Sequence, residues 1–140
     1  MTKAHKEVEL AVHVGKHPEG LARVLATVAQ HGVNVLAYCA YSEREETVVL
    51  LVSENPFDAK RALEGAGYRC KANSVVLVGA TQQVAAAAHL GASLRYAGVE
   101  ILYSYASSAG ADRFFTVFKT VDDEKAINVL EKHSLEQRAA

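Results

Sequence analysis

The sequence lacks the features that mark secreted, membrane and nucleic-acid-binding proteins. It has only two cysteines, Cys39 and Cys70, without a CxxC spacing, which favours free buried thiols in a reducing compartment over a disulfide framework. No stretch reaches the roughly 20 apolar residues of a membrane span, and residues 1–7 are polar, unlike a secretory signal. The net charge is -1, with no basic patch of the kind that binds nucleic acid. We therefore expect a cytoplasmic protein.

Residue patterns typical of catalysis and metal binding are also missing. The six histidines form no i, i+4 pair on a predicted helix and have no cysteine partner. The serines include no Gly-x-Ser-x-Gly elbow, and there is no phosphate-binding loop. Phe114, Phe115 and Phe118 invite comparison with the stacking residues of an RNA-recognition module, but the basic glycine-rich context is absent. We predict no catalytic residues, no metal, no cofactor, and neither nucleic acid nor membrane as a partner.

What the sequence does contain is an internal repeat in a composition that is 50% hydrophobic and 22% charged, as in ordinary globular domains. When the chain is aligned with itself, Gly32–Leu36 falls on Gly98–Leu102, and at the same offset Val48–Val52 falls on Phe114–Phe118. With a single insertion, Ala59–Leu63 falls on Ala126–Leu130. This repeat predicts two small domains of like fold, residues 1–73 and 74–140. Two domains create an interface, where small ligands tend to bind.

The first copy has the patterns of alternating strands and helices. Val8–Val14 alternates apolar and polar residues as a strand does, and Leu21, Val24, Leu25 and Val28 recur at helical spacing up to Gly32, a candidate helix C-terminal glycine. The further elements are two strands, a helix capped by Ser53, Asn55 or Asp58, and a long strand, at residues 33–41, 47–52, 56–63 and 68–78. The order βαββαβ predicts an α+β, ferredoxin-like fold with an antiparallel sheet and helices on one face.

The second copy repeats this order but ends early. Ser74–Val78 serves as its first strand, followed by a helix over 84–97, strands over 99–106 and 113–121, and a helix from Asp122 to Lys132 or His133. The polar tail, residues 134–140, is too short for a convincing final strand. We therefore expect the last strand of this copy to be short, missing or borrowed from a partner chain.

Several strands are apolar on both faces, and this pattern indicates that something covers the second face. In the segment 33–41, one face carries Val33, Val35 and Ala37, while the other carries Leu36 and Tyr38. A sheet with helices on one face exposes the other face unless something covers it. We expect the other copy or another chain to cover it, and hence a homodimer.

Two stretches carry a resemblance to a known family. Residues Pro18 to Leu25, which open the first helix, and Gly32-Val33-Asn34-Val35, which leads into the second strand, resemble an ACT domain, the regulatory module that binds amino acids beside many metabolic enzymes. Both copies look like ACT domains and together cover nearly the whole chain. The pattern departs from the family at Glu19, where ACT domains usually have glycine, and at Val84-Ala85, which replaces the Pro-Gly pair in the second copy.

The loop before each first helix is the candidate binding site. A strand that enters a helix through a tight turn leaves backbone N–H groups unpaired at the positive end of the helix dipole, which favours a carboxylate such as that of an amino acid. The resemblance to ACT dimers implies that backbone carbonyls of residues 33–41 in a neighbouring copy accept from the ammonium group. The candidate residues are His17, Pro18, Glu19, Gly20, Leu21, Asn34 and Tyr38 at the first site, and Thr81, Gln82, Gln83 and Ser104 at the second.

These expectations lead to a function and two alternatives. The resemblance implies a non-enzymatic regulatory protein that binds a small molecule, an amino acid, at ACT–ACT interfaces. The first alternative is a regulatory subunit that binds and controls a metabolic enzyme through its apolar sheet face. The second is an enzyme built on a ferredoxin-like sheet, an architecture that hosts many functions.

Overall fold

Two long strands, β1 and β4, take part in both structural units of the chain. The computed structural model describes residues 3–16, 19–80, 84–108 and 114–139. Contacts divide the chain into a first unit, Val8–Asn73, and a second unit, which combines Ser74–Ala140 with Met1–Glu7. The elements are, in order, β1 (Lys3–His13), α1 (Gly20–Gln30), β2 (Val35–Glu43), β3 (Glu46–Ser53), α2 (Pro56–Gly65), β4 (Arg69–Ala80), α3 (Val84–Tyr96), β5 (Ile101–Ser108), β6 (Phe114–Thr120) and α4 (Asp123–Ala139).

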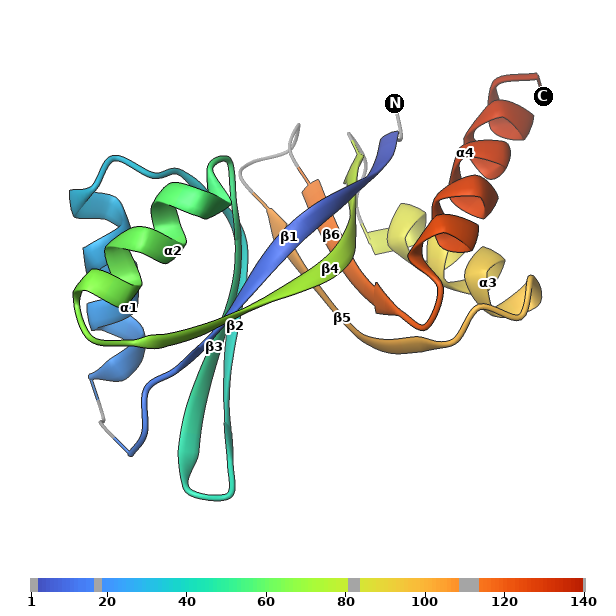
Figure 1. The fold of residues 1–140 in the computed structure, drawn as a ribbon. Helices are drawn as coiled ribbons and strands as arrows, with labels where there is room; N and C mark the ends of the chain where they lie inside the picture. The colour runs from blue at the N-terminus through green and yellow to red at the C-terminus, as the bar shows by residue number, and fades with distance from the viewer. Residues whose placement is uncertain (1–2, 17–18, 81–83, 109–113, 140) are drawn as a thin grey trace. The chain divides into compact units, whose positions relative to one another are not determined.

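The first unit has the predicted βαββαβ order. Its strands lie in the order β2-β3-β1-β4, and the antiparallel register places Leu51 of β3 between Leu10 of β1 and Tyr38 of β2. Helices α1 and α2 lie along one face of this sheet (Figure 1). The core between the helices and the sheet is made of fully buried aliphatic side chains, among them Leu10, Val12, Val24, Val28, Leu51 and Leu63.

Glycine ends the helix where the sequence predicts it. Gly32 has φ +71°, its N–H donates to the carbonyl of Ala29 at 3.0 Å, and Val33 N–H donates to the carbonyl of Val28 at 3.2 Å. This bond pair is a Schellman motif, which needs a left-handed residue and therefore favours glycine. The motif recurs at Gly98 in the second unit, where Val99 N–H donates to Leu94 at 2.9 Å.

The start of the chain completes the sheet of the second unit. The strands of this unit lie in the order β1-β4-β6-β5, and its share of β1 is the segment before Val8. Ala4, only 4% exposed, belongs to the core cluster of Val76, Leu94, Phe118 and Leu130. The expectation of a missing or partner-borrowed strand was therefore wrong, because the chain supplies the strand from its own first residues. The described part of the tail forms no strand, and α4 instead runs to Ala139, beyond its predicted end.

The two units share details of their strand geometry. Each edge strand has a register shift at the same place in the repeat, between Val35 and Ala37 in β2 and between Ile101 and Tyr103 in β5. These positions are related by the same offset that places Gly32 on Gly98. The repeated irregularity supports a duplication, because bulges are specific features of a fold.

Register corrects the sequence alignment in the third strand of the repeat. Val12 pairs with Val49 in the first unit, and its counterpart Val78 pairs with Thr116 in the second. Val49 therefore corresponds to Thr116 and not to Phe115, which means that the insertion precedes β6. The alignment of Val48–Val52 with Phe114–Phe118 is one position out of register, and such a slip assigns every side chain to the wrong face.

Several side chains on the sheet faces opposite the helices are buried, although Tyr41 on the same face of β2 is 44% exposed. In the first unit these buried side chains alternate with the core residues and are at most 6% exposed: Ala37, Val48, Leu50 and Val52. In the second unit Leu77 and Val117 are equally buried. The homodimer remains a prediction. In the described part of the chain, no helix is both long enough and apolar enough to cross a membrane.

Candidate functional site

The connection from β1 to α1 carries the first predicted site. Pairing with β3 continues beyond His13, because Val14 N–H donates to Thr47 at 3.0 Å and Thr47 N–H donates to Gly15 at 2.9 Å. Gly15 then turns the chain with φ +62°. The helix begins at Gly20. Two of the predicted residues, His17 and Pro18, lie outside the described residues.

Gly20 is the residue that brings the helix start close to the sheet. A Cβ atom placed on Gly20 would lie 2.6 Å from Cγ2 of Val14, which is closer than real Cβ contacts. Gly20 and Val14 are both buried, so neither can move outward to relieve the clash. Any larger residue at this position must push the first turn of α1 away from β1. Leu21, the next predicted residue, packs against the core of the first unit.

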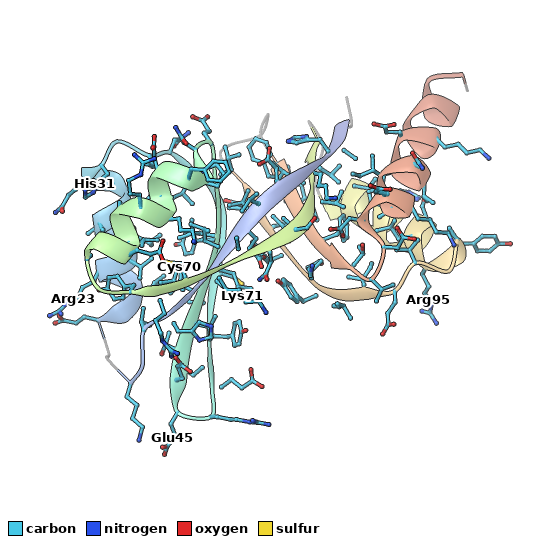
Figure 2. The ribbon with its side chains drawn as sticks, viewed as in Figure 1. Arg23, His31, Glu45, Cys70, Lys71 and Arg95 are labelled. Carbon is cyan, nitrogen blue, oxygen red and sulfur yellow. The ribbon has the colours of Figure 1, made fainter. Side chains whose placement is uncertain are left out.

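Glu19 precedes the helix and carries the charge that would oppose an anionic ligand. It occupies the N-cap position without a side-chain capping bond, and its carboxylate lies 3.2 Å from the guanidinium of Arg23. Arg23 is one of the labelled side chains on α1 (Figure 2). Both side chains are more than half exposed, so the pair contributes little to stability. It does place a positive charge beside Glu19, which reduces the repulsion of a ligand carboxylate.

Asn34 and Gly20 lie at opposite ends of the first unit. Asn34 precedes β2, and its carbonyl accepts from Glu54 N–H at 3.0 Å, just after the end of β3. Gly20 packs on Val14, which pairs with the start of β3. The intervening stretch of β1, from Val8 to Val14, spans roughly 20 Å at about 3.3 Å per residue. These two candidates can therefore serve one ligand only across an interface.

Tyr38 and Ser104 occupy the same place in the two units. Tyr38 pairs with Leu51 and Ser104 with Phe118, so both side chains lie on the helix-facing side of an edge strand. Tyr38 is 45% exposed, which leaves its ring available to a ligand. The other candidates of the second unit, Thr81, Gln82 and Gln83, lie outside the described residues.

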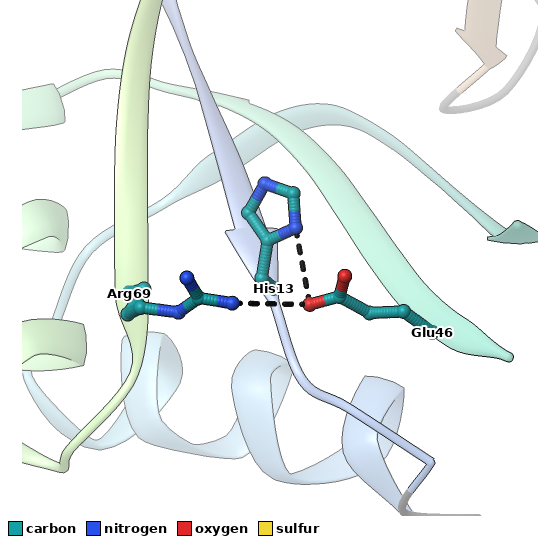
Figure 3. A network of polar contacts seen from close by, with 3 residues as sticks. All are labelled: His13, Glu46 and Arg69. Carbon is teal, nitrogen blue, oxygen red and sulfur yellow. Dashed lines mark hydrogen bonds and ion pairs between the residues drawn. The ribbon is translucent and has the colours of Figure 1, made fainter. Parts of the chain in front are cut away.

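A polar cluster that sequence reasoning missed joins three strands of the first unit. Oε1 of Glu46 lies 3.2 Å from Nδ1 of His13 and 3.4 Å from Nη2 of Arg69 (Figure 3). The contact to His13 lacks hydrogen-bond geometry and becomes an ion pair only when the imidazole is protonated. These residues lie far apart in the sequence, and only the strand register brings them together. The cluster links the ends of β1, β3 and β4.

The two thiols have the properties of structural cysteines. Burial raises the pKa of Cys70 to about 11, with a smaller contribution from Glu64, and Lys60 opposes the rise. Burial also raises the pKa of Cys39, with a contribution from Glu9. A raised pKa depletes the thiolate, which is the reactive form. Among the described residues, no group of three or more His, Cys, Asp or Glu side chains is placed to hold a metal ion.

Comparison with known proteins finds similar folds among solved structures. The sequence matches no family model and no curated protein. The structure is similar to protein BT0572 from Bacteroides thetaiotaomicron, with TM-score 0.81 and 21% identity over 94% of this chain and 90% of that one. It is also similar to the ligand-free regulatory subunit of aspartate kinase from Thermus thermophilus, with TM-score 0.65 and 13% identity over 90% and 91%.

A third similar structure is much longer than this chain. Escherichia coli aspartokinase III, in complex with lysine and aspartate, aligns with TM-score 0.52 and 16% identity over 94% of this chain and 31% of its own. At these identities the likeness shows the fold alone. The ferredoxin-like, ACT-type fold predicted from the sequence is confirmed.

Proposed function

We propose that this protein is a non-enzymatic regulatory protein that binds an amino acid at ACT–ACT interfaces, through the β1–α1 connection of one copy and the edge strand β2 of another. The observation that carries the proposal is the start of α1. There Gly20 holds the first turn against Val14, closer than any other residue would allow. This packing fixes the N–H groups of the first helical turn, which are the ones without helical partners.

The chemistry of these two elements matches a zwitterion. Unpaired N–H groups at the positive end of α1 favour a carboxylate. Strand β2 lies at the end of the strand order, so one side of its backbone has no neighbouring strand among the described residues. Its outward carbonyls can accept from an ammonium group. The start of α1 packs on Val14, which follows β1, whereas the open edge of β2 lies beyond β3 in the strand order. An interface between copies is therefore the place where we propose that one amino acid meets both.

The fold neighbours support a regulatory role of this kind. One is a regulatory subunit in its ligand-free form, and another is an aspartokinase in complex with lysine and aspartate. This chain spans most of the regulatory subunit but under a third of the aspartokinase. We therefore propose a regulatory role for this chain and assign it no catalysis.

A thermal-shift screen tests the proposal. The purified protein is heated with each common amino acid at millimolar concentration, and with the corresponding amino acid amide as a control that lacks the carboxylate. A ligand present at about one hundred times its Kd stabilises by about 2.7 kcal/mol, which corresponds to several degrees in Tm for a chain of this size. We expect a rise with one amino acid or a related group and not with its amide. No rise with any amino acid contradicts the proposal.

A second candidate function is that of a regulatory subunit of an enzyme. It is favoured by the large share of a known regulatory subunit that aligns with this chain. Because the chain aligns over 91% of a regulatory subunit of aspartate kinase, a role as the subunit of a metabolic enzyme fits this coverage. The docking surface in that case is the apolar sheet face, on which Tyr41 is 44% exposed. Purification from the source cells distinguishes the two functions. A stoichiometric enzyme partner favours the subunit, and an isolated protein that binds an amino acid favours the sensor.

A further inference from the structure

An open groove lies between helices α3 and α4 of the second unit. It has a volume of about 640 Å³, within the range of small-ligand sites. Its described lining residues are His89, Ala92, Ser93, Tyr96, Ala97, Val129 and Lys132. Both helices belong to the same unit, and neither contributes to the β1–α1 connection discussed above.

The lining of the groove combines an apolar surface with positive charge. Ala92, Ala97 and Val129 provide small and branched apolar side chains. Lys132 is the only lining residue with a permanent charge, and no aspartate or glutamate is among the described lining residues. Arg95, labelled in Figure 2, adds a second positive charge to the last turn of α3. An occupant with an apolar body and one negative charge is complementary to this surface.

Tyr96 stands at the groove with its side chain almost fully open to solvent. It is 97% exposed, the highest value among the large hydrophobic residues of the described chain. An aromatic ring in this position gains apolar contact area only if something binds beside it. It can then cover a ligand that lies on Ala92 and Ala97.

The end of α1 in the first unit differs from the equivalent end of α3 in one side chain that affects the groove. In both units a hydroxyl bonds to the carbonyl one helical turn earlier, Thr27 to Arg23 and Ser93 to His89, each at 2.8 Å. In the first unit the imidazole of His31 folds back and donates to Thr27 O at 2.9 Å. The residue at the position that corresponds to His31 in the second unit is Ala97. Loss of the imidazole leaves space above the last turn of α3.

The charge on the last helix also differs between the two units. In the register that places Val49 on Thr116, Lys132 corresponds to Gly65 of the first unit, and Val129 corresponds to Ala62. The second unit thus has a cation and a larger apolar side chain on the same scaffold, where the first unit has neither. The added cation and the larger apolar side chain favour an apolar anion.

We propose that the α3–α4 groove binds a small carboxylic acid with an apolar body, whose carboxylate pairs with Lys132 and whose body lies between Tyr96 and the Ala92–Ala97 surface. This site is separate from the amino-acid site and does not depend on it. A neutral molecule of the same shape binds the same surface more weakly, because it lacks the pairing with Lys132.

An NMR titration of the full-length, ¹⁵N-labelled protein tests the proposal with 4-phenylbutyrate and its neutral amide, 4-phenylbutanamide, as probes. We expect saturable shifts of amides in α3 and α4, and about three- to fivefold tighter binding of the carboxylate, the size of an exposed charge pair. Lys132→Gln should bring the carboxylate to the affinity of the amide. Lys125→Gln, an exposed lysine of the same helix outside the groove, should leave both affinities unchanged.

A second variant tests the shape of the groove. Ala97→His restores the residue of the first unit and should weaken both probes at least fivefold, while circular dichroism confirms that the helices persist. The proposal is overturned if 4-phenylbutyrate produces no saturable shifts on α3 and α4 at about 10 mM, or if the shifts lie elsewhere. It is also overturned if Lys132→Gln leaves the preference for the carboxylate intact.

Discussion

The last helices of the two units begin with the same backbone and different chemistry. In the second unit, Asp123 accepts from Thr120 Oγ1 at 2.6 Å and from Ser74 Oγ at 2.7 Å. The neighbouring Asp122 caps α4, because its Oδ1 accepts from Lys125 N–H at 3.1 Å. The single carboxylate of Asp123 therefore ties the start of α4 to two strands, β4 and β6.

The first unit has none of these bonds at the start of α2. Ser53 corresponds to Thr120, and its buried Oγ has no hydrogen-bond partner. Asn55 stands at the N-cap without a side-chain bond, and Pro56 occupies the place of Asp123. Both helices nevertheless bury matching core residues, Ala59 and Ala126, each at 0% exposure. The comparison teaches that apolar packing maintains the duplicated fold, while the polar bonds at the helix start are free to diverge.

The largest effect is expected from Asp123→Ala. The change leaves the hydroxyls of Ser74 and Thr120 without their acceptor at partly buried positions, and should destabilise the second unit by about 2–3 kcal/mol. Urea unfolding measures the loss, and hydrogen exchange assigns it to a unit. Asp58→Ala, an exposed first-turn acid of α2, is the control and should cost under about 1 kcal/mol. Equal losses in the two variants would show that the Asp123 bonds are not special.

A pair of glycine substitutions gives effects of opposite sign. Gly20→Ala in α1 should destabilise the protein by about 1–3 kcal/mol, because the new Cβ meets Val14 at 2.6 Å. Gly91→Ala in α3 meets nothing within 4 Å and should stabilise by about 1 kcal/mol through helix propensity. Thermal unfolding reports both changes. A Gly20→Ala protein as stable as the original would refute the close approach of α1 to β1.

Ser53→Ala should have a small effect. The substitution removes a buried hydroxyl that has no partner, so we expect between no change and a gain of about 1 kcal/mol in the free energy of unfolding. Thr120→Val, the matching change in the second unit, removes a bonded hydroxyl and should cost about 1 kcal/mol. A loss of more than about 1 kcal/mol on Ser53→Ala would mean that Ser53 has a bonding role.

The rate of cysteine alkylation monitors the first unit alone, because both cysteines lie in that unit. With its pKa raised from 9.0 to about 11, Cys70 should be alkylated by iodoacetamide at pH 8 about a hundredfold more slowly than an unperturbed thiol. The rate should rise about tenfold per pH unit up to about pH 11. Mass spectrometry of the Cys70 peptide measures it. Rapid alkylation at pH 8 would show that the side chain is not shielded.

Local sequence patterns predicted most of the fold. The helical spacing of Val24 and Val28, the C-terminal glycine Gly32 and the internal repeat each reflect a constraint within one element or within one copy. Residues Lys3 to Glu7 gave no such indication. They are mostly polar, and the structure places Ala4 in the buried core of the second unit. This position depends on core residues from the other half of the sequence, so no local pattern could predict it.

The candidate site was harder to predict for a similar reason. The sequence could identify Gly20 as a glycine at the start of a helix. Only the structure shows that Val14 leaves no room for a side chain at this position. The cluster of His13, Glu46 and Arg69 depends on strand register, and the repeat alignment in β6 was one position off until pairing fixed it. Sequence patterns identify elements, whereas contacts between strands require the folded chain.

Isothermal titration calorimetry with Gly20→Ala tests the central claim most directly, namely that the α1 start of an ACT-type fold binds an amino acid. The ligand is the amino acid with the largest thermal shift, and Gly91→Ala is the matched control. The account predicts binding to the original protein and to Gly91→Ala with equal Kd, and at least tenfold weaker binding to folded Gly20→Ala. Unchanged affinity in Gly20→Ala, or no heat of binding to the original protein, would contradict it.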